Sequence, residues 1–185
     1  MFAQILRQAC VLLVGAGLIS LAACKSYQLG HPTELPFETI YVQAATNDSY
    51  APQAQALISS EIREAIIRDG RVKLVAGQND ADVILYVNLT DYKRQAGTRD
   101  QDDTEVAQDY AITLEAEIAL YDPRNDTYLF KSRTVGEHTT AYAGNPYTDS
   151  GVLQTGGLIQ SEYQAMTRIA RGMGRKIADE TLSAW

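Results

Sequence analysis

Few side chains in this sequence could carry out covalent chemistry. The two histidines are His31 and His138, and the two cysteines are Cys10 and Cys24. His31 lies in an N-terminal segment with glycine and proline, and His138 follows a predicted strand, so neither histidine is expected beside a cysteine. The pairing of a nucleophile with a base, on which covalent catalysis depends, is therefore not indicated.

Cys24 has the surroundings of a lipidation site. Arg7 is followed by a mostly apolar segment, residues 9–19, which is shorter than the roughly 20 residues that cross a bilayer core and is typical of a secretory signal. The four residues that end at Cys24, LAAC, resemble a bacterial lipoprotein signal, in which cleavage leaves the cysteine as a lipidated N-terminus. A plain signal peptide with an incidental cysteine is the alternative. We therefore predict a signal peptide over residues 1–23 and a stable anchor of several acyl chains on Cys24.

The charge balance argues against nucleic acid as a partner. The chain has 23 acidic and 16 basic side chains and a formal net charge of −7, whereas phosphate binding needs a dense basic surface. The acidic run 100–105 suggests a cation site by composition, but it lacks the glycine and distal glutamate of a calcium-binding loop. A solvated loop is favoured, and we expect neither a metal nor a cofactor.

The first half of the chain reads as a tether followed by strands and one helix. Residues 24–36 contain glycine and two prolines and predict a tether. Residues 37–43 predict a strand, and residues 47–52 offer capping side chains and a proline before a helix that ends at Gly70. A short strand is then expected at residues 71–75, and a longer one at residues 81–92.

The clearest pattern is a hairpin. Residues 110–121 alternate between apolar and polar side chains, residues 122–126 predict a turn, and residues 127–137 predict the returning strand. A five-residue turn places Lys131 opposite Glu117 and Arg133 opposite Glu115 on the solvated face, and it pairs Leu120 with Tyr128 and Ile118 with Phe130 on the buried face.

A long second helix is expected after a glycine-rich loop, residues 140–157. Apolar residues then recur at alternating spacings of four and three: Ile159, Tyr163, Met166, Ala170, Met173 and Ile177. Gly172 and Gly174 weaken this helix unless they permit close packing. Residues 37–185 are thus predicted to form a single α+β domain, with two helices on one face of a mainly antiparallel or mixed sheet and the other face polar.

Basic side chains near the ends of these strands suggest a site for anionic head groups. Contact with phosphates by guanidinium and ammonium groups is the functional hypothesis for Lys93, Arg94, Arg99, Lys131 and Arg133. The simpler interpretation is that Lys131 and Arg133 pair across the strands with Glu117 and Glu115. The sequence leaves both open.

Several segments together resemble the LptE family of outer-membrane lipopolysaccharide-assembly lipoproteins. They are the region around Cys24, with SYQLG at residues 26–30, then IYVQAATN at residues 40–47, ADVILYVNLTDYKR at residues 81–94, DYAITLEAEIALYD at residues 109–122 and LFKSRTV at residues 129–135. The resemblance implies a non-enzymatic protein at the outer membrane, facing the periplasm. It also implies a plug and assembly partner of the large LptD β-barrel, taking part in the insertion of lipopolysaccharide.

Two other function classes stay open. A CsgG-like secretion component or a TolB-like envelope scaffold has a similar small α+β domain, and a CsgG-like protein should form a ring of its own chains. An enzyme would need an acid or base at Asp91, Asp109 or His138 that lines a closed pocket.

Overall fold

The computed structural model describes residues 35–99, 105, 107–143 and 155–183. The chain divides into two units, residues 1–33 and 34–185, and all the strands and helices named below belong to the second. The predicted signal peptide, Cys24, most of the tether and most of the acidic run 100–105 lie outside the described residues.

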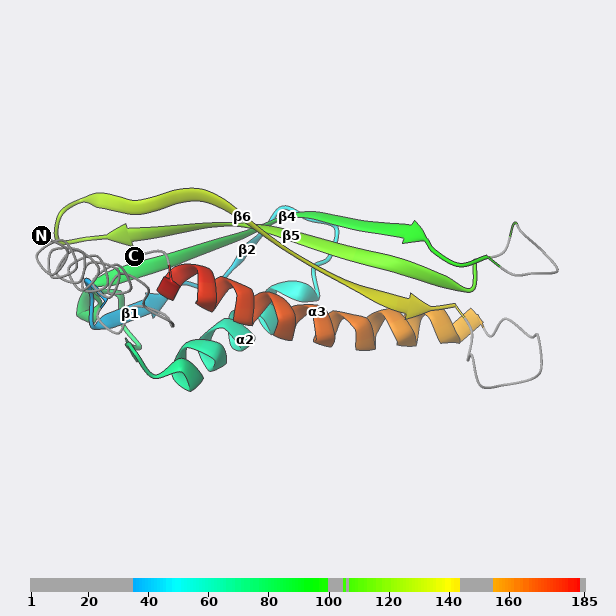
Figure 1. The fold of residues 1–185 in the computed structure, drawn as a ribbon, viewed down its shortest axis with the longest axis horizontal. Helices are drawn as coiled ribbons and strands as arrows, with labels where there is room; N and C mark the ends of the chain where they lie inside the picture. Colours follow the sequence, from blue (N-terminus) through cyan, green and yellow to red (C-terminus); the bar gives the residue numbers. More distant parts are fainter. Residues whose placement is uncertain (1–34, 100–104, 106, 144–154, 184–185) are drawn as a thin grey trace, which may run out of the picture. The chain divides into compact units, whose positions relative to one another are not determined.

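A mixed β-sheet forms one layer of this unit (Figure 1). Its strands lie in the order β3 (Lys73–Leu74), β1 (Thr39–Val42), β4 (Val83–Ala96), β5 (Asp109–Asp122) and β6 (Thr127–Tyr142), and β2 (Thr46–Asn47) pairs with β4. Strand β1 runs parallel to both of its neighbours, whereas β4, β5 and β6 form an antiparallel meander. The sequence predicted every strand except β2.

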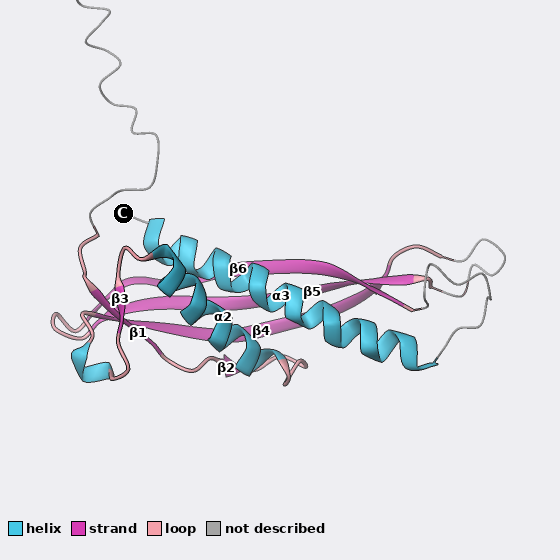
Figure 2. Cartoon of the chain, turned by 90° about the horizontal axis from the view of Figure 1, so that it is seen from below, coloured by secondary structure: helices cyan, strands magenta, loops and turns pink. Residues whose placement is uncertain are grey.

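Two helices form the second layer. Helix α2 (Ala54–Asp69) and helix α3 (Thr155–Ser183) lie side by side on the same face of the sheet (Figures 1 and 2). The apolar core fills the space between the layers, and its fully buried side chains include Ile58, Ile62, Leu85, Leu114 and Met173. The predicted α+β class, with both helices on one face of a mixed sheet, is confirmed. We call the sheet face without helices the open face.

The ends of α2 show which local signals were correct. Gly70 ends the helix as predicted: it has a φ of 75°, and its N–H donates to the carbonyl oxygen of Ile66. The expected side-chain cap is absent: Gln53 occupies the N-cap position, and its side chain makes no capping hydrogen bond. Instead, Asn47 stabilises the preceding turn, where its side chain accepts from the N–H of Ser49 at 2.9 Å and donates to the carbonyl of Ala51 at 2.9 Å.

The predicted hairpin register is wrong. Thr127 lies opposite Asp122, so the turn is one residue shorter at its start than expected. Two further shifts of one residue each follow on β6, and Ser132 adopts a φ of 55° within the second. As a result Glu117 lies opposite Thr134 and Ile118 lies opposite Arg133. Neither predicted charge pair is a cross-strand pair.

The apolar stripe of α3 is covered only in part. Met166, Ala170, Met173 and Ile177 are fully buried as expected, but Ile159 is 74% exposed and Tyr163 is 66% exposed. The physical reason is length: α2 has 16 residues and α3 has 29, so α2 lies alongside only the C-terminal part of α3 (Figure 2). The first turns of α3 extend beyond it.

Candidate functional site

The structure places four of the five predicted head-group contacts on opposite faces of the sheet and the fifth, Arg99, beyond the end of β4. Arg94 and Arg133 turn toward α3, where Arg94 contacts Glu162 at 3.1 Å and Arg133 contacts Glu180 at 2.8 Å. The prediction that Arg133 lies on the solvated face is therefore wrong, because the bulge at Ser132 changes which face its side chain occupies.

The two lysines and Arg99 lie elsewhere. Lys93 follows Tyr92, a contact of α3, so strand alternation places Lys93 on the open face, where it pairs with Asp91 at 2.5 Å. Lys131 also lies on the open face, with its ammonium 3.8 Å from the centre of the Tyr128 ring. Arg99 lies beyond β4, in a bridge to Ala107. The five side chains do not form one strip.

Tyrosines gather on the open face near the β5–β6 turn. Tyr86, Tyr121 and Tyr128 come from three adjacent strands, with ring centres 6.4 Å apart for the first pair and 5.0 Å for the second. Tyr121 donates to the Asp126 carboxylate at 2.6 Å, and this hydrogen bond raises the pKa of Tyr121 to about 12. On β4, Ile84 lies opposite Tyr121. Ile84 is fully buried although it is not part of the core beneath the helices. The tyrosines therefore add an apolar layer to this face.

A groove lies beside these rings. It has a volume of about 350 Å³, and the residues that line it include Tyr86, Ala119, Tyr128, Asn88, Glu117 and Lys131. Ala119 lies opposite Tyr86 in the register, so a small side chain lies next to an aromatic one in the groove. We call this feature the tyrosine groove. The sequence is rich in tyrosine, with 11 tyrosines against 3 phenylalanines. The groove itself could not be predicted, because only the strand pairing brings these tyrosines together.

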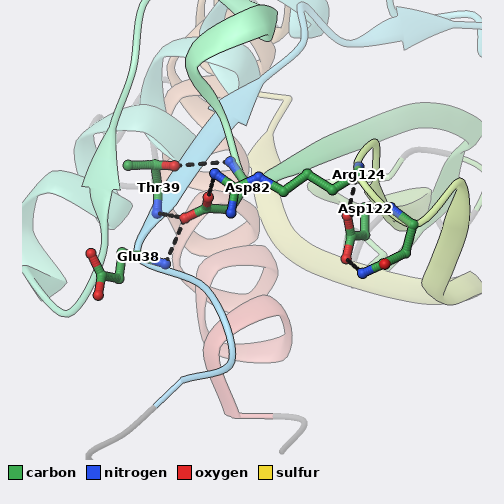
Figure 3. Close-up of polar contacts among 6 residues, drawn as sticks. Glu38, Thr39, Asp82, Asp122 and Arg124 are labelled. Atoms are coloured by element: carbon green, nitrogen blue, oxygen red, sulfur yellow. Dashed lines mark hydrogen bonds and ion pairs between the residues drawn. The ribbon is translucent and has the colours of Figure 1, made fainter.

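Asp82 joins three segments at one end of the sheet (Figure 3). Its carboxylate accepts from the N–H of Glu38 at 2.9 Å and of Thr39 at 2.8 Å, and it pairs with Arg124 of the β5–β6 turn. Burial raises the pKa of Asp82, but the two N–H donors, the Thr39 hydroxyl and Arg124 lower it more, so its pKa lies below the ordinary value. This site holds the ends of β1 and β4 together and has the role of a structural clamp.

Helix α3 is held to the sheet by polar contacts on the helix side. Tyr92 donates to Glu162, and burial together with this hydrogen bond raises the pKa of Tyr92, so the hydroxyl stays protonated. Lys176 pairs with Glu137 at 3.0 Å. Burial raises the pKa of Glu137, but the hydrogen bond from Lys176 and the N–H of His138 lower it more.

The same helix covers the outer edge of β6. Strand β6 is the last strand of the sheet, and Lys176 donates to the carbonyl of Gly136 at 2.9 Å while Arg168 donates to the carbonyl of Thr140 at 2.7 Å. The hydroxyl of Ser161 accepts from the N–H of Tyr142 at 2.7 Å. These are the groups with which a further strand would pair, so α3 blocks this half of the edge.

The hypothetical acid–base residues do not meet. Asp91 is paired with Lys93, Asp109 accepts from the N–H of Thr98 at 2.8 Å, and His138 lies opposite Thr113 on the hairpin. Within the described ranges, no group of three acidic, histidine or cysteine side chains is placed to hold a metal ion. A search of the described helices for one with the length and apolar content of a membrane span found none.

Comparison with protein families decides the identity. Residues 37–179 match the model of the LptE family, which is described as lipopolysaccharide-assembly, and this range covers most of the chain. The chain belongs to the LptE family. No curated protein matches it.

Solved structures share the fold of this LptE-family chain at low identity. A candidate lipoprotein from Caulobacter crescentus CB15 is 20% identical, with 79% of this chain and 89% of that chain covered and a TM-score of 0.51. A minor lipoprotein from Acinetobacter baumannii is 10% identical, with 81% and 96% covered and a TM-score of 0.50. A protein from Xanthomonas campestris is 12% identical, with 84% and 88% covered and a TM-score of 0.52. At these identities the likeness concerns the fold alone.

Membership of the LptE family sets the general function. The chain belongs to a family of lipopolysaccharide-assembly proteins, and this family is one of assembly proteins rather than enzymes. The matched range includes all six strands, α2 and α3 as far as Asp179. The open face, the tyrosine groove and the α3 contacts except that of Glu180 therefore lie within the family domain.

Proposed function

We propose that this LptE-family chain is a lipid-anchored outer-membrane protein that acts as plug and assembly partner of the LptD β-barrel, in the transport and insertion of lipopolysaccharide. The family match over residues 37–179 carries the proposal. A barrel lumen is polar, and the chain's tyrosine-rich, partly charged open face and the outer side of its helices suit such surroundings.

The anchor is the second part of the proposal. Cleavage after residue 23 leaves Cys24 as the lipidated end, and residues 24–36 connect it to the domain that begins at residue 37. Several acyl chains on one cysteine give stable membrane binding. The anchor then keeps the domain near the inner leaflet of the outer membrane, where a barrel partner opens to the periplasm.

The third part concerns contact with lipopolysaccharide. Lys131 and Lys93 lie on the open face and can approach anionic head groups directly. Arg94 and Arg133 can contact phosphate only beside their glutamate partners on α3, and Arg99 would contribute from beyond the end of β4. We therefore propose Lys131 as the leading contact among the five.

Co-purification tests the partnership. The tagged, lipidated chain is isolated from outer membranes in a mild detergent, and the proteins bound to it are identified and counted by mass spectrometry. One copy of a large β-barrel protein per copy of the chain is the expected result. A ring of this chain alone, as for a CsgG-like component, or the absence of any barrel would contradict the proposal, and the covered edge of β6 already disfavours assembly edge to edge.

A matched pair of variants tests the lipopolysaccharide contact. Lys131→Glu reverses the charge beside the Tyr128 ring, whereas Lys73→Glu makes the same change on exposed strand β3, at the opposite edge of the sheet. Weaker lipopolysaccharide binding by the first variant alone is expected. Equal binding by both variants and the unaltered chain would exclude Lys131 as a contact.

A further inference from the structure

The tyrosine groove has the composition of a sugar-binding site. Tyr86 and Tyr128 form its aromatic part, and 42% of the surface of Tyr128 is exposed. A tyrosine ring offers an apolar face for the C–H groups of a ligand while its hydroxyl stays in contact with water. Two such rings from β4 and β6 lie on either side of β5, so a ligand on the open face can contact both.

One small residue leaves room at the floor of the groove. Ala119 of β5 pairs with Tyr86 of β4, and its methyl group leaves open the space beside the Tyr86 ring. The resulting volume of about 350 Å³ lies at the lower end of the range for small-molecule sites. It suits a ligand of one or two rings.

The rim is polar and partly fixed in place. The Thr46 hydroxyl donates to the Asn88 side-chain oxygen at 2.8 Å, and the Asn88 amide donates to the Asp48 carboxylate at 2.8 Å. The Lys131 ammonium lies 3.8 Å from the centre of the Tyr128 ring, just before the bulge at Ser132. Hydrogen-bonding groups therefore stand around the aromatic rings before any ligand arrives, which lowers the cost of ordering them on binding.

The charges on the rim select among ligand classes. Glu117 and Lys131 both line the groove, so a donor of hydrogen bonds can contact the carboxylate and an acceptor can contact the ammonium. For a bare phosphate, the attraction of Lys131 would be offset by the repulsion of Glu117, and a hydrocarbon chain would cover these charges without replacing their contacts with water. A ligand ring with many hydroxyl groups and an apolar face can contact the tyrosine rings of the groove and also hydrogen-bond to the charged groups on its rim.

We propose that the tyrosine groove binds a single saccharide ring, a hexose or hexosamine, packed against Tyr86 and Tyr128 above Ala119, with its hydroxyl groups toward Glu117 and Lys131. The groove itself is argued from its geometry, while the choice of lipopolysaccharide as the source of the sugar rests on the proposed function. An unrelated envelope glycan offers the same ring chemistry, so the test compares the two sources.

Saturation-transfer NMR and titration calorimetry on the lipidated full-length chain measure this binding. The detergent must have no sugar head group, since a maltoside would compete for the groove. The probes are the glucosamine disaccharide of the lipid A backbone and maltotriose, a neutral glucan. A dissociation constant on the order of 1 mM is expected for the preferred sugar, as for a weak single-ring contact.

Two variants of β5 separate the groove from the rest of the open face. Ala119→Leu fills the floor, and Ala111→Leu adds the same side chain at an exposed position on the same face of the same strand. At least a tenfold loss of sugar affinity is expected for the first and no change for the second. Tyr128→Ala, which removes one ring without filling the groove, is expected to give a similar loss.

The outcomes distinguish this inference from the proposed function. Tighter binding of the glucosamine disaccharide supports lipopolysaccharide as the source, and tighter binding of maltotriose keeps the groove but overturns that source. Equal affinities for all variants, no sugar binding, or displacement of the sugar by a short fatty acid would overturn the groove. Co-purification of the barrel with the Ala119→Leu variant is measured in parallel, so that a failed partnership is recognised separately.

Discussion

Gly174 is the position where α3 comes closest to α2. A Cβ atom at Gly174 would lie 2.8 Å from the carbonyl carbon of Glu61 and 2.9 Å from its carbonyl oxygen, closer than Cβ atoms approach such groups in proteins. Gly172, two residues earlier on the same helix, has a different neighbour, because a Cβ atom there would lie 2.7 Å from the Glu137 carboxylate. The first obstacle is backbone, and the second is the end of a flexible side chain.

The same substitution should therefore have different effects at the two positions. Alanine in place of a helical glycine favours the folded state by about 1 kcal/mol. At Gly174 the backbone of α2 must move by about 0.6 Å to reach ordinary contact, which loosens the packing of Ile58 and Ile62 and costs about 3 kcal/mol. The net loss in the free energy of unfolding is about 2 kcal/mol. At Gly172 the glutamate can rotate away, with the loss of a partly buried ion pair to Lys176 worth about 1 kcal/mol, which roughly offsets the gain in helix propensity.

Thermal unfolding followed by circular dichroism measures the difference. For a domain of this size, Gly174→Ala should lower the melting temperature by about 4–8 °C, while Gly172→Ala should leave it unchanged or raise it slightly. Equal shifts in the same direction would refute the reasoning, because they would show that helix propensity, and not the contact with the α2 backbone, decides the effect.

Two further predictions concern Asp82 and the edge of β6. Asp82→Asn should lower the free energy of unfolding by about 2 kcal/mol at pH 7, because the charged acceptor of two N–H groups is lost. Since the pKa of Asp82 is lowered on folding, its contribution is present above about pH 4 and lost as the pH falls through the folded pKa, so the difference from the unaltered chain should shrink in acid; a constant difference between pH 7 and pH 2 would contradict this. Replacing both Arg168 and Lys176 by alanine should expose the β6 carbonyls and cause concentration-dependent self-association in sedimentation velocity. Arg171→Ala, an exposed change on the same helix, is the control, and a double variant that sediments like it at all concentrations would exclude a protective role for α3.

Local patterns predicted the elements where local forces decide the structure. The glycine at position 70 ended α2 because a left-handed residue satisfies the last turn of a helix. The alternation along β5 predicted its buried side chains, since every second residue of a strand faces the core. Strand β2 was missed because two residues carry no periodic signal, and it forms only through its pairing with β4.

The candidate site was harder to predict because it depends on irregular pairing. Ser132 is not a glycine, so nothing in the sequence marks its positive φ or the change of face at Arg133. A second shift on β4, between Leu89 and Asp91, likewise decides which of Lys93 and Arg94 meets α3. The exposed part of the α3 stripe was missed for a tertiary reason, since the period of a helix does not tell where its neighbour ends.

The parallel pairing of β1 has a consequence for the order of folding. Strand β1 precedes both of its partner strands, β3 and β4, along the chain. Its pairing with β4 joins Ile40 to Val83. Closing so long a segment costs more chain entropy than closing the β5–β6 turn, where Asp122 pairs with Thr127. The meander should form early and β1 should dock late, so a folding intermediate should have β4, β5 and β6 already paired while β1 is not yet part of the sheet.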